Sequence, residues 1–174
     1  MIYMVEMNLI DLSDRSAWDN WYLEHTKMLL SFPGFYATQR FECIHETKAP
    51  FVALHHVDGM DFFNSHPYKN KAGPSGTGIW RNKMNNWNRN LFDGLETTPN
   101  VKEKELLIII EDEAKVRLDE KLEVHWLTSV GLDMNVKCRG LAVTSLSKSS
   151  EISTNTPGVR VLKPIFNRLT KDDL

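Results

Sequence analysis

The sequence predicts an α+β fold, and three observations lead to it. Apolar and polar residues alternate at Ile2–Leu9, 36–44 and Phe51–Val57, which predicts three strands. The stretch 18–35, WDNWYLEHTKMLLSFPGF, spaces its apolar residues along one helical face and ends in proline and glycine. The residues from 99 onward repeat a shortened version of the same pattern. We therefore expect two related halves, organised around the helix in 18–35.

The first strand and the helix after it have clear local signals. Along the strand, apolar residues such as Tyr3 point one way, and Glu6 and Asn8 point the other, so one face packs and the other meets more polar surroundings. The helix is expected at 18–31, with Ser13 as its N-cap. It ends before Pro33 because proline removes a backbone donor.

The remaining elements of the first half complete a known order. They are strands at 36–44 and Phe51–Val57, a short helix at 60–66, a long loop at 67–78 expected to be the most mobile part, helical character at 79–84, and a strand at 87–92. Residues 1–98 therefore follow the ferredoxin-like order β-α-β-β-α-β, with both helices on one face of an antiparallel sheet. The bare face of such a sheet is usually covered by a second sheet.

Residues 99–174 are expected to form a second, shortened β-α-β-β half packed against the first. Its elements are a strand at 106–111, a helix at 119–130, a strand at 136–146, a flexible loop at 147–157 and a strand at 159–169 that Pro164 places on an edge. When the two halves are aligned, His25 and His125 occupy matching places on the two expected helices. Together the halves predict an antiparallel α+β barrel with helices outside. Closure within one chain is favoured, and homodimer formation stays open.

Composition excludes several classes of partner and site. The net charge is −2 without a basic stripe, so no nucleic-acid partner is expected. The longest apolar run, 106–110, is too short to span a membrane, and no targeting segment is read at the start of the chain, so a cytoplasmic protein is expected. Cys43 and Cys138 are too few and too far apart for a disulfide framework or a CxxC metal site.

Residues 18–93 resemble the dimeric α+β barrel superfamily, which includes the EthD-like and related small-barrel proteins. The matching residues are Trp21-Tyr22, Glu24-His25, Met28-Leu29, Pro33-Gly34-Phe35, Arg40-Phe41, Pro50 with 51–54, Ser65, Tyr68 and Thr77. The superfamily includes monooxygenases, polyketide cyclases, dehydratases, decarboxylases and haem-binding enzymes. The resemblance implies a ligand pocket between sheet and helices.

This resemblance implies one expected function and two alternatives. The first is a lyase or isomerase without a cofactor, which acts by proton transfer on an aromatic or polyketide-like acid or carbonyl compound. Its reaction would be dehydration, decarboxylation, isomerisation or cyclisation. The second is a barrel that binds a small-molecule ligand without catalysis. The third is a haem- or metal-binding, monooxygenase-like barrel.

Three residues are candidates for catalysis. The superfamily often has a histidine at the helical place of His25, which suits a general base or a hydrogen-bond donor; the alternative is a histidine bonded to a strand backbone or to Glu24. Arg40 could hold a carboxylate or enolate, or form an internal ion pair with Glu42 or Glu6. Tyr68 opens the long loop and could close over a ligand, or belong to a plain surface loop.

A larger set is expected to contact the ligand. It consists of Glu6, Asn8, Trp21, Tyr22, Tyr36, His55, His56, His66, Trp80 and Trp87. A buried Glu6 would have a raised pKa, whereas the alternative is solvent exposure. His55 and His56 are adjacent on a strand, so their rings face opposite sides and cannot chelate one ion, and no metal site is expected. Most tryptophans are expected in the core, with one or two lining the pocket. Haem-degrading barrels of the superfamily use Asn, Trp and His, but the spacing of Asn8, His66 and Trp80 does not match that pattern.

Overall fold

The computed structural model describes residues 1–73, 75–111, 122–147 and 156–174. Its elements are β1 (Ile2–Leu9), η1 (Leu12–Asp14), α1 (Arg15–Leu30), β2 (Phe35–Cys43), β3 (Phe51–Val57), α2 (Met60–Asn64), α3 (His66–Lys71), η2 (Ser75–Asn82), β4 (Met84–Asp93), β5 (Glu105–Glu111), β6 (His125–Leu132), β7 (Cys138–Ser145), β8 (Val159–Pro164), β9 (Leu169–Thr170) and η4 (Lys171–Asp173). None of the helices in the described residues is long and apolar enough to cross a bilayer.

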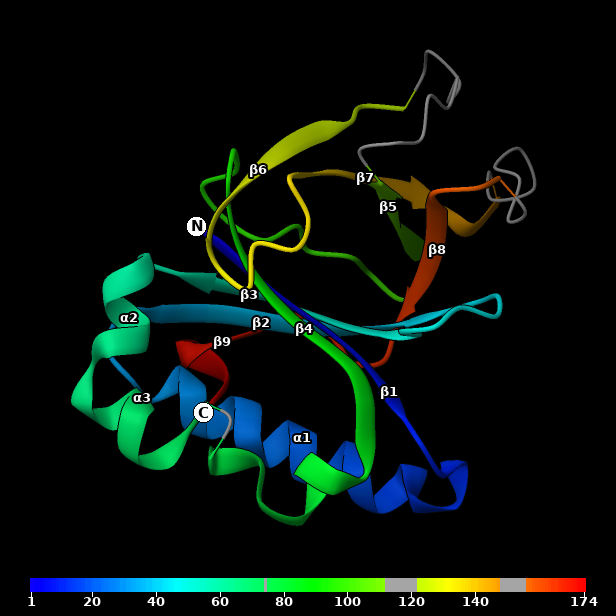
Figure 1. Cartoon of the computed structure of the whole chain (residues 1–174). Helices are drawn as coiled ribbons and strands as arrows, with labels where there is room; N and C mark the ends of the chain where they lie inside the picture. Colours follow the sequence, from blue (N-terminus) through cyan, green and yellow to red (C-terminus); the bar gives the residue numbers. More distant parts are fainter. Residues whose placement is uncertain (74, 112–121, 148–155) are drawn as a thin grey trace.

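Eight strands close into one antiparallel barrel within the chain (Figure 1). They follow the order β3-β1-β4-β6-β7-β5-β8-β2, and the pairing of β2 with β3 closes the ring. The first four strands lie in the order β2-β3-β1-β4, and the next four repeat it as β6-β7-β5-β8. This is the ferredoxin-like strand order in both cases. The prediction of an α+β barrel built from two such halves is confirmed.

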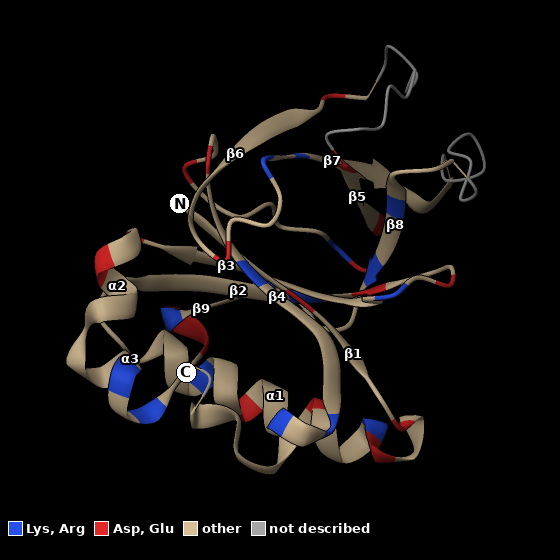
Figure 2. Ribbon diagram, viewed as in Figure 1, with Lys and Arg blue, Asp and Glu red and all other residues tan. Residues whose placement is uncertain are grey.

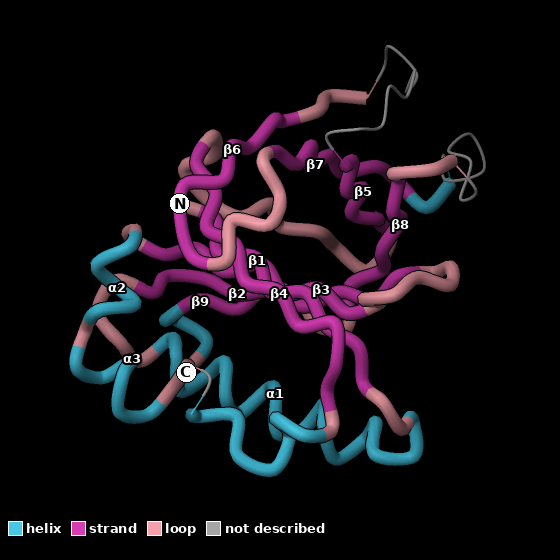
Figure 3. The backbone as a smooth tube through the Cα atoms, viewed as in Figure 1, coloured by secondary structure: helices cyan, strands magenta, loops and turns pink. Residues whose placement is uncertain are grey.

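The helices lie outside the barrel, as expected, and α1, α2, α3 and η2 gather on one side of it (Figure 3). Strand alternation divides the core accordingly. Tyr3, Val5 and Met7 of β1 join the apolar cluster beneath these helices. Ile2 and Met4 point the other way, into a second cluster inside the barrel. The two faces of β1 therefore pack into two separate apolar clusters, one under the helices and one inside the barrel.

The segment expected as a loop at 67–78 is instead largely helical. Pro67 stands in the first turn of α3, where its missing donor costs no hydrogen bond, and Tyr68 is buried. The buried Trp80 anchors η2, and Lys83 just beyond it pairs with Asp14 at 2.8 Å. These contacts overrode the Gly- and Pro-rich composition, which had suggested a mobile loop.

The helix expected at 119–130 is wrong where the structure describes it, because 125–130 belong to β6. Leu127, Ser129 and Gly131 are buried and the residues between them are exposed, so the true period is two. Residues 119–121 and most of the loop expected at 147–157 lie outside the described residues. His125 is thus a strand residue and not a counterpart of His25.

The final strand also differs from expectation. β8 ends at Pro164 and lies between β5 and β2, so it is not an edge strand. Proline is tolerated there because it is the last residue of the strand, and Ile165 next to it donates its amide to the carbonyl of Arg40 at 2.8 Å.

Candidate functional site

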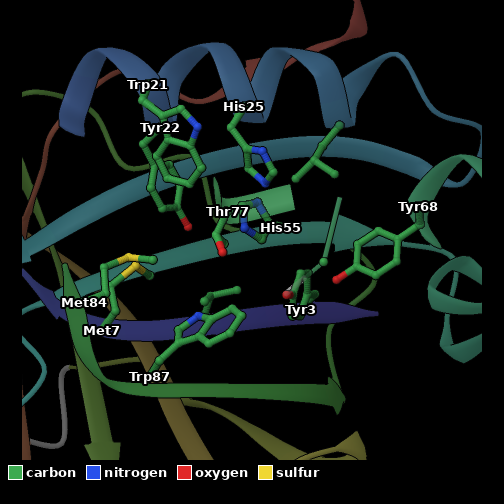
Figure 4. A pocket seen from close by; sticks show the side chains of 13 residues that line it. Tyr3, Met7, Trp21, Tyr22, His25, His55, Tyr68, Thr77, Met84 and Trp87 are labelled. Carbon is green, nitrogen blue, oxygen red and sulfur yellow. The ribbon is translucent and has the colours of Figure 1, made fainter. Parts of the chain in front are cut away.

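A pocket lies on the outer face of the barrel, under the helical cover (Figure 4). It is lined by Tyr3, Val5, Met7, Trp21, Tyr22, His25, Leu29, His55, Tyr68, Gly73, Thr77, Met84 and Trp87. The space open to the centre of a water molecule is about 40 Å³. The pocket therefore lies between sheet and helices, where the resemblance implied one.

The periodicities of the helix and the strand bring these side chains to one side of each element. Trp21, His25 and Leu29 are four residues apart on α1, so they project from one face of the helix. Tyr3 and Val5 are two apart on β1 and face the same side of the sheet. α3 and η2 contribute the opposite wall. Thr77 of this wall, Met7 of β1 and Met84 of β4 were not among the predicted ligand contacts, although Thr77 was one of the residues carrying the resemblance.

His25 points from α1 into the pocket (Figure 4). Its ring stacks on Trp21 at 5.0 Å between centroids and an interplanar angle of 21°. Burial lowers its pKa to about 4, so it is neutral at physiological pH. Glu24 pairs with Lys27 at 2.8 Å, so it does not hold the histidine.

His55 reaches the pocket from β3 and is 1% exposed. Its Nδ1 lies 2.8 Å from Oγ1 of the buried Thr38. Burial lowers the pKa of His55 to about 3, with a further lowering from His25. His56 faces the other way and packs beside Tyr36, with the ring centroids 4.9 Å apart. The expectation that the adjacent rings face opposite sides is confirmed.

Three tyrosines add hydroxyl groups to the pocket walls. Burial raises the pKa of Tyr22 to about 12, although Arg40 opposes the rise. Burial also raises the pKa of Tyr3, and the neighbouring Tyr68 adds to the effect. The Tyr68 hydroxyl is itself buried and points toward the cavity, but it makes no hydrogen bond of normal geometry (Figure 4).

These shifts make the pocket electrically neutral. None of its lining residues in the described part of the chain is Asp, Glu, Lys or Arg. The two histidines stay deprotonated at pH 7 and the shifted tyrosines stay protonated. A carboxylate would enter without a compensating charge, which is costly in a buried site. Neutral ligands that accept or donate hydrogen bonds suit the pocket better.

Arg40 does not line this pocket. It is fully buried between α1 and β2, with its guanidinium 3.9 Å from the Trp18 ring and 4.2 Å from the Tyr22 ring. Its ion-pair partner is Asp19, at 2.7 Å, and not Glu42 or Glu6. Arg40 therefore supports Tyr22 from behind, a contact that no local pattern in the sequence indicates.

Glu6 faces the barrel interior, so the alternative of solvent exposure is wrong. It forms ion pairs with Arg160 and Arg139, which also contact Glu111. Burial alone would raise the pKa of Glu6, but the two arginines outweigh it and the pKa is lowered. The expected raised pKa is thus wrong. The signal that could have found these partners was a lone arginine in each of two apolar strands, CRGLAV and VRVL.

The other predicted contacts divide between the pocket and separate places. Trp80 packs against Trp21 next to the pocket, with the ring centroids 5.9 Å apart and the planes tilted by 34°. Asn8 donates to Asn85 at 3.0 Å, and His66 contacts Asn70 on its own helix.

Tyr36, another predicted contact, lies away from the pocket. Its side chain is 40% exposed, and its hydroxyl donates to Asp58 at 2.6 Å.

Within the described ranges, His, Cys, Asp and Glu form no group of three suited to a metal ion. Acidic and basic residues are interspersed along the ribbon (Figure 2).

No family model matches the sequence, and no curated protein matches it either. A likeness is found among solved structures, to a "putative monooxygenase from Lactobacillus acidophilus NCFM". The two chains share 10% identity with a TM-score of 0.54, and the match covers 98% of this chain and 96% of the other. At this identity the likeness shows the fold, and the chain is a small α+β barrel over nearly its whole length.

Proposed function

We propose that this barrel binds a small neutral aromatic compound, a ketone, aldehyde, quinone or phenol, in the pocket beneath α1. We propose further that it catalyses a proton transfer on that compound, in an isomerisation, cyclisation, dehydration or decarboxylation. The observation that carries the proposal is the electroneutral pocket with two uncharged histidines among aromatic walls. We also propose that this chain is related to the EthD-like proteins.

In this reaction His25 acts as the general base. Its ring has no hydrogen-bond partner in the described residues, so its lone pair is free to accept a proton from the ligand. A pKa of about 4 keeps the ring neutral and ready to accept. The imidazolium that forms is stabilised by the enolate or phenolate produced beside it. Tyr68 contributes a hydroxyl donor, and Arg40 contributes by holding Tyr22 in place.

The size of the pocket adds a requirement. A protein cavity of about 150 Å³ holds benzene, whereas this pocket offers about 40 Å³. An aromatic ligand therefore enters only if the cover moves. We place this movement at η2, which contributes Thr77 to one wall of the pocket; the half-exposed Lys83–Asp14 pair beside it holds η2 only weakly, because exposed ion pairs contribute little to stability.

A second function, ligand binding without turnover, is favoured by one observation. A base with a pKa of about 4 is weak at neutral pH. A barrel that only sequesters a hydrophobic ligand would have the same neutral walls and would not need a stronger base.

Thermal-shift measurements of the purified protein test the proposal. The panel pairs neutral aromatic ketones and phenols with the corresponding aromatic carboxylates, and a compound that binds only the folded state raises the midpoint. Hits are then incubated with the protein and followed by mass spectrometry, with and without O2. His25→Ala is compared with His66→Ala, a histidine on the outer helix α3.

The outcomes separate the functions. Loss of conversion in His25→Ala alone, with the thermal shift retained, supports proton transfer by His25. A shift without conversion in the native protein supports sequestration. Conversion that requires O2 would replace proton transfer by oxygenation. Preference for the carboxylates over the neutral compounds would refute the assignment of the pocket.

A further inference from the structure

The contact between Thr38 and His55 fixes the chemical character of the pocket histidine. Thr38 lies on β2 and His55 opposite it on β3, where the two residues are register partners. Both side chains are buried, and Thr38 Oγ1 lies 2.8 Å from His55 Nδ1. The ring is also held between Tyr3 and Phe35, each with its centroid 5.2 Å away. The orientation of the imidazole is thus set from three sides.

The threonine hydroxyl determines which nitrogen carries the proton. Its oxygen has no other side-chain or backbone partner among the described residues, so Nδ1 is the available acceptor for its hydrogen. If Nδ1 carried the ring proton, the hydroxyl would accept it and leave its own hydrogen buried without a partner. A buried donor without a partner is unfavourable, because it has lost its hydrogen bonds to water and gained none in return. The proton of the neutral imidazole therefore resides on Nε2.

Nε2 is the nitrogen that meets the cavity. His55 lines the pocket, and Nε2 forms no hydrogen bond with the described residues. Nε2 is not fully buried, although it has no hydrogen-bond partner in the described part of the chain, so it retains access to the pocket. A neutral imidazole with its N–H directed into a buried site is a hydrogen-bond donor and not a base.

We propose that His55 is a carbonyl-recognising residue, whose Nε2–H donates to the oxygen of a neutral ketone, aldehyde or quinone, and that Thr38 is the positioning residue that fixes this tautomer. The inference rests on the proposed function and narrows its ligand class from neutral aromatic compounds to those with a carbonyl oxygen. It also divides the work between the histidines. When His25 removes a proton from the carbon next to the carbonyl, the electron pair of the C–H bond forms a C=C bond, the π pair of the carbonyl moves to its oxygen, and His55 stabilises the resulting enolate.

Nitrogen-15 NMR of uniformly labelled protein at pH 7 tests the tautomer without any ligand. The expected spectrum has the ring nitrogens of His55 at the shifts of a single neutral form protonated on Nε2. Thr38→Val keeps the shape of the side chain but removes the hydroxyl, and the Nδ1–H form is expected to become measurable. Thr38→Ser restores the hydroxyl and the single tautomer. His56→Gln, on the opposite face, is the matched control and leaves the His55 signals unchanged.

Binding of two probes of similar shape tests the donor role. Acetophenone carries the carbonyl oxygen, whereas α-methylstyrene replaces it by a CH2 group. A net neutral hydrogen bond is worth roughly 0.5–1.5 kcal/mol, so acetophenone is expected to bind roughly 2- to 12-fold more tightly. His55→Phe is expected to abolish this preference, and Thr38→Val to reduce it. Thr38→Ser and His56→Gln are expected to retain it.

Each result has a distinct consequence. An Nδ1-protonated His55 in the native protein would overturn the tautomer and the donor role, and the proposed function would survive if acetophenone still bound. The expected tautomer without a preference for acetophenone would overturn the carbonyl assignment alone. If neither probe bound, the carbonyl assignment and the aromatic-ligand proposal would fail together. An unchanged tautomer and preference in Thr38→Val would remove Thr38 from the proposal.

Discussion

The buried histidine of the pocket should make the fold sensitive to acid, and His55→Phe should relieve that sensitivity. His55 has a pKa of about 3 in the folded protein, against 6.5 for a free side chain. The unfolded chain therefore binds a proton as the pH falls below 6.5, while the folded protein does not until the pH approaches 3. Because the unfolded state binds more protons in this range, stability is present above it and is lost as the pH falls.

The size of the effect between pH 7 and pH 5 depends little on the folded-state pKa. At pH 5 the folded ring is still neutral, whereas nearly all of the unfolded rings are charged. Integrating the difference in bound protons from pH 7 to pH 5 gives a loss of about 2 kcal/mol in the free energy of unfolding from this one group. Phenylalanine has no such titration, so the variant should lose about 2 kcal/mol less than the native protein over the same interval.

Urea unfolding followed by tryptophan fluorescence at several pH values measures this difference. The comparison concerns the change with pH, so a lower absolute stability of the variant does not disturb it, provided that the m-values agree. His125→Gln is the control substitution, because that side chain is 46% exposed and does not line the pocket. Parallel loss of stability in the native protein and in His55→Phe would refute the neutral, buried state of His55.

Three further changes probe the frame that holds the site. Glu6→Gln removes the carboxylate between two buried arginines and should cost about 3–5 kcal/mol in urea unfolding, whereas Glu24→Gln on the surface should change stability by less than about 0.5 kcal/mol. Arg40→Lys gives up the guanidinium contacts with the rings of Trp18 and Tyr22 and should cost about 1–2 kcal/mol by the same measurement, with retention of full stability arguing against a contribution from these contacts. Gly94→Ala places a Cβ 2.6 Å from the carbonyl oxygen of Trp126 at a φ of +122°, and thermal melting should show a loss of roughly 2 kcal/mol or more.

Local patterns were sufficient for β1, α1, β2 and β3 and for the fold class. Strand alternation in β1 and the four-residue repeat in α1 are strong signals because each element packs only one face. They failed at β6, where the residues of HWLTSV suit both periods and only pairing with β4 and β7 decides. They failed again at α3 and η2, where burial of Tyr68 and Trp80 outweighs a loop-like composition.

The candidate site was predictable in part for the same reason. His25, Trp21 and Tyr68 were expected near the ligand from the resemblance, and all three line the pocket. The Thr38–His55 contact depends on strand register, and the Arg40–Asp19 pair depends on how α1 crosses β2. Neither relation is encoded in residue spacing along the chain.

The distribution of charge explains why the candidate pocket lies outside the barrel. The described charged groups inside it pair with one another, as Glu6 does with Arg160 across the interior. Arg139 on β7 and Arg160 on β8 belong to the second half of the chain. This half therefore covers the bare face of the first sheet and also neutralises the inward carboxylate of Glu6. The apolar clusters on that side leave the interior as structural core. The neutral pocket, with its mainly aromatic and apolar lining, lies instead on the helical side, between the sheet and the helices α1, α3 and η2.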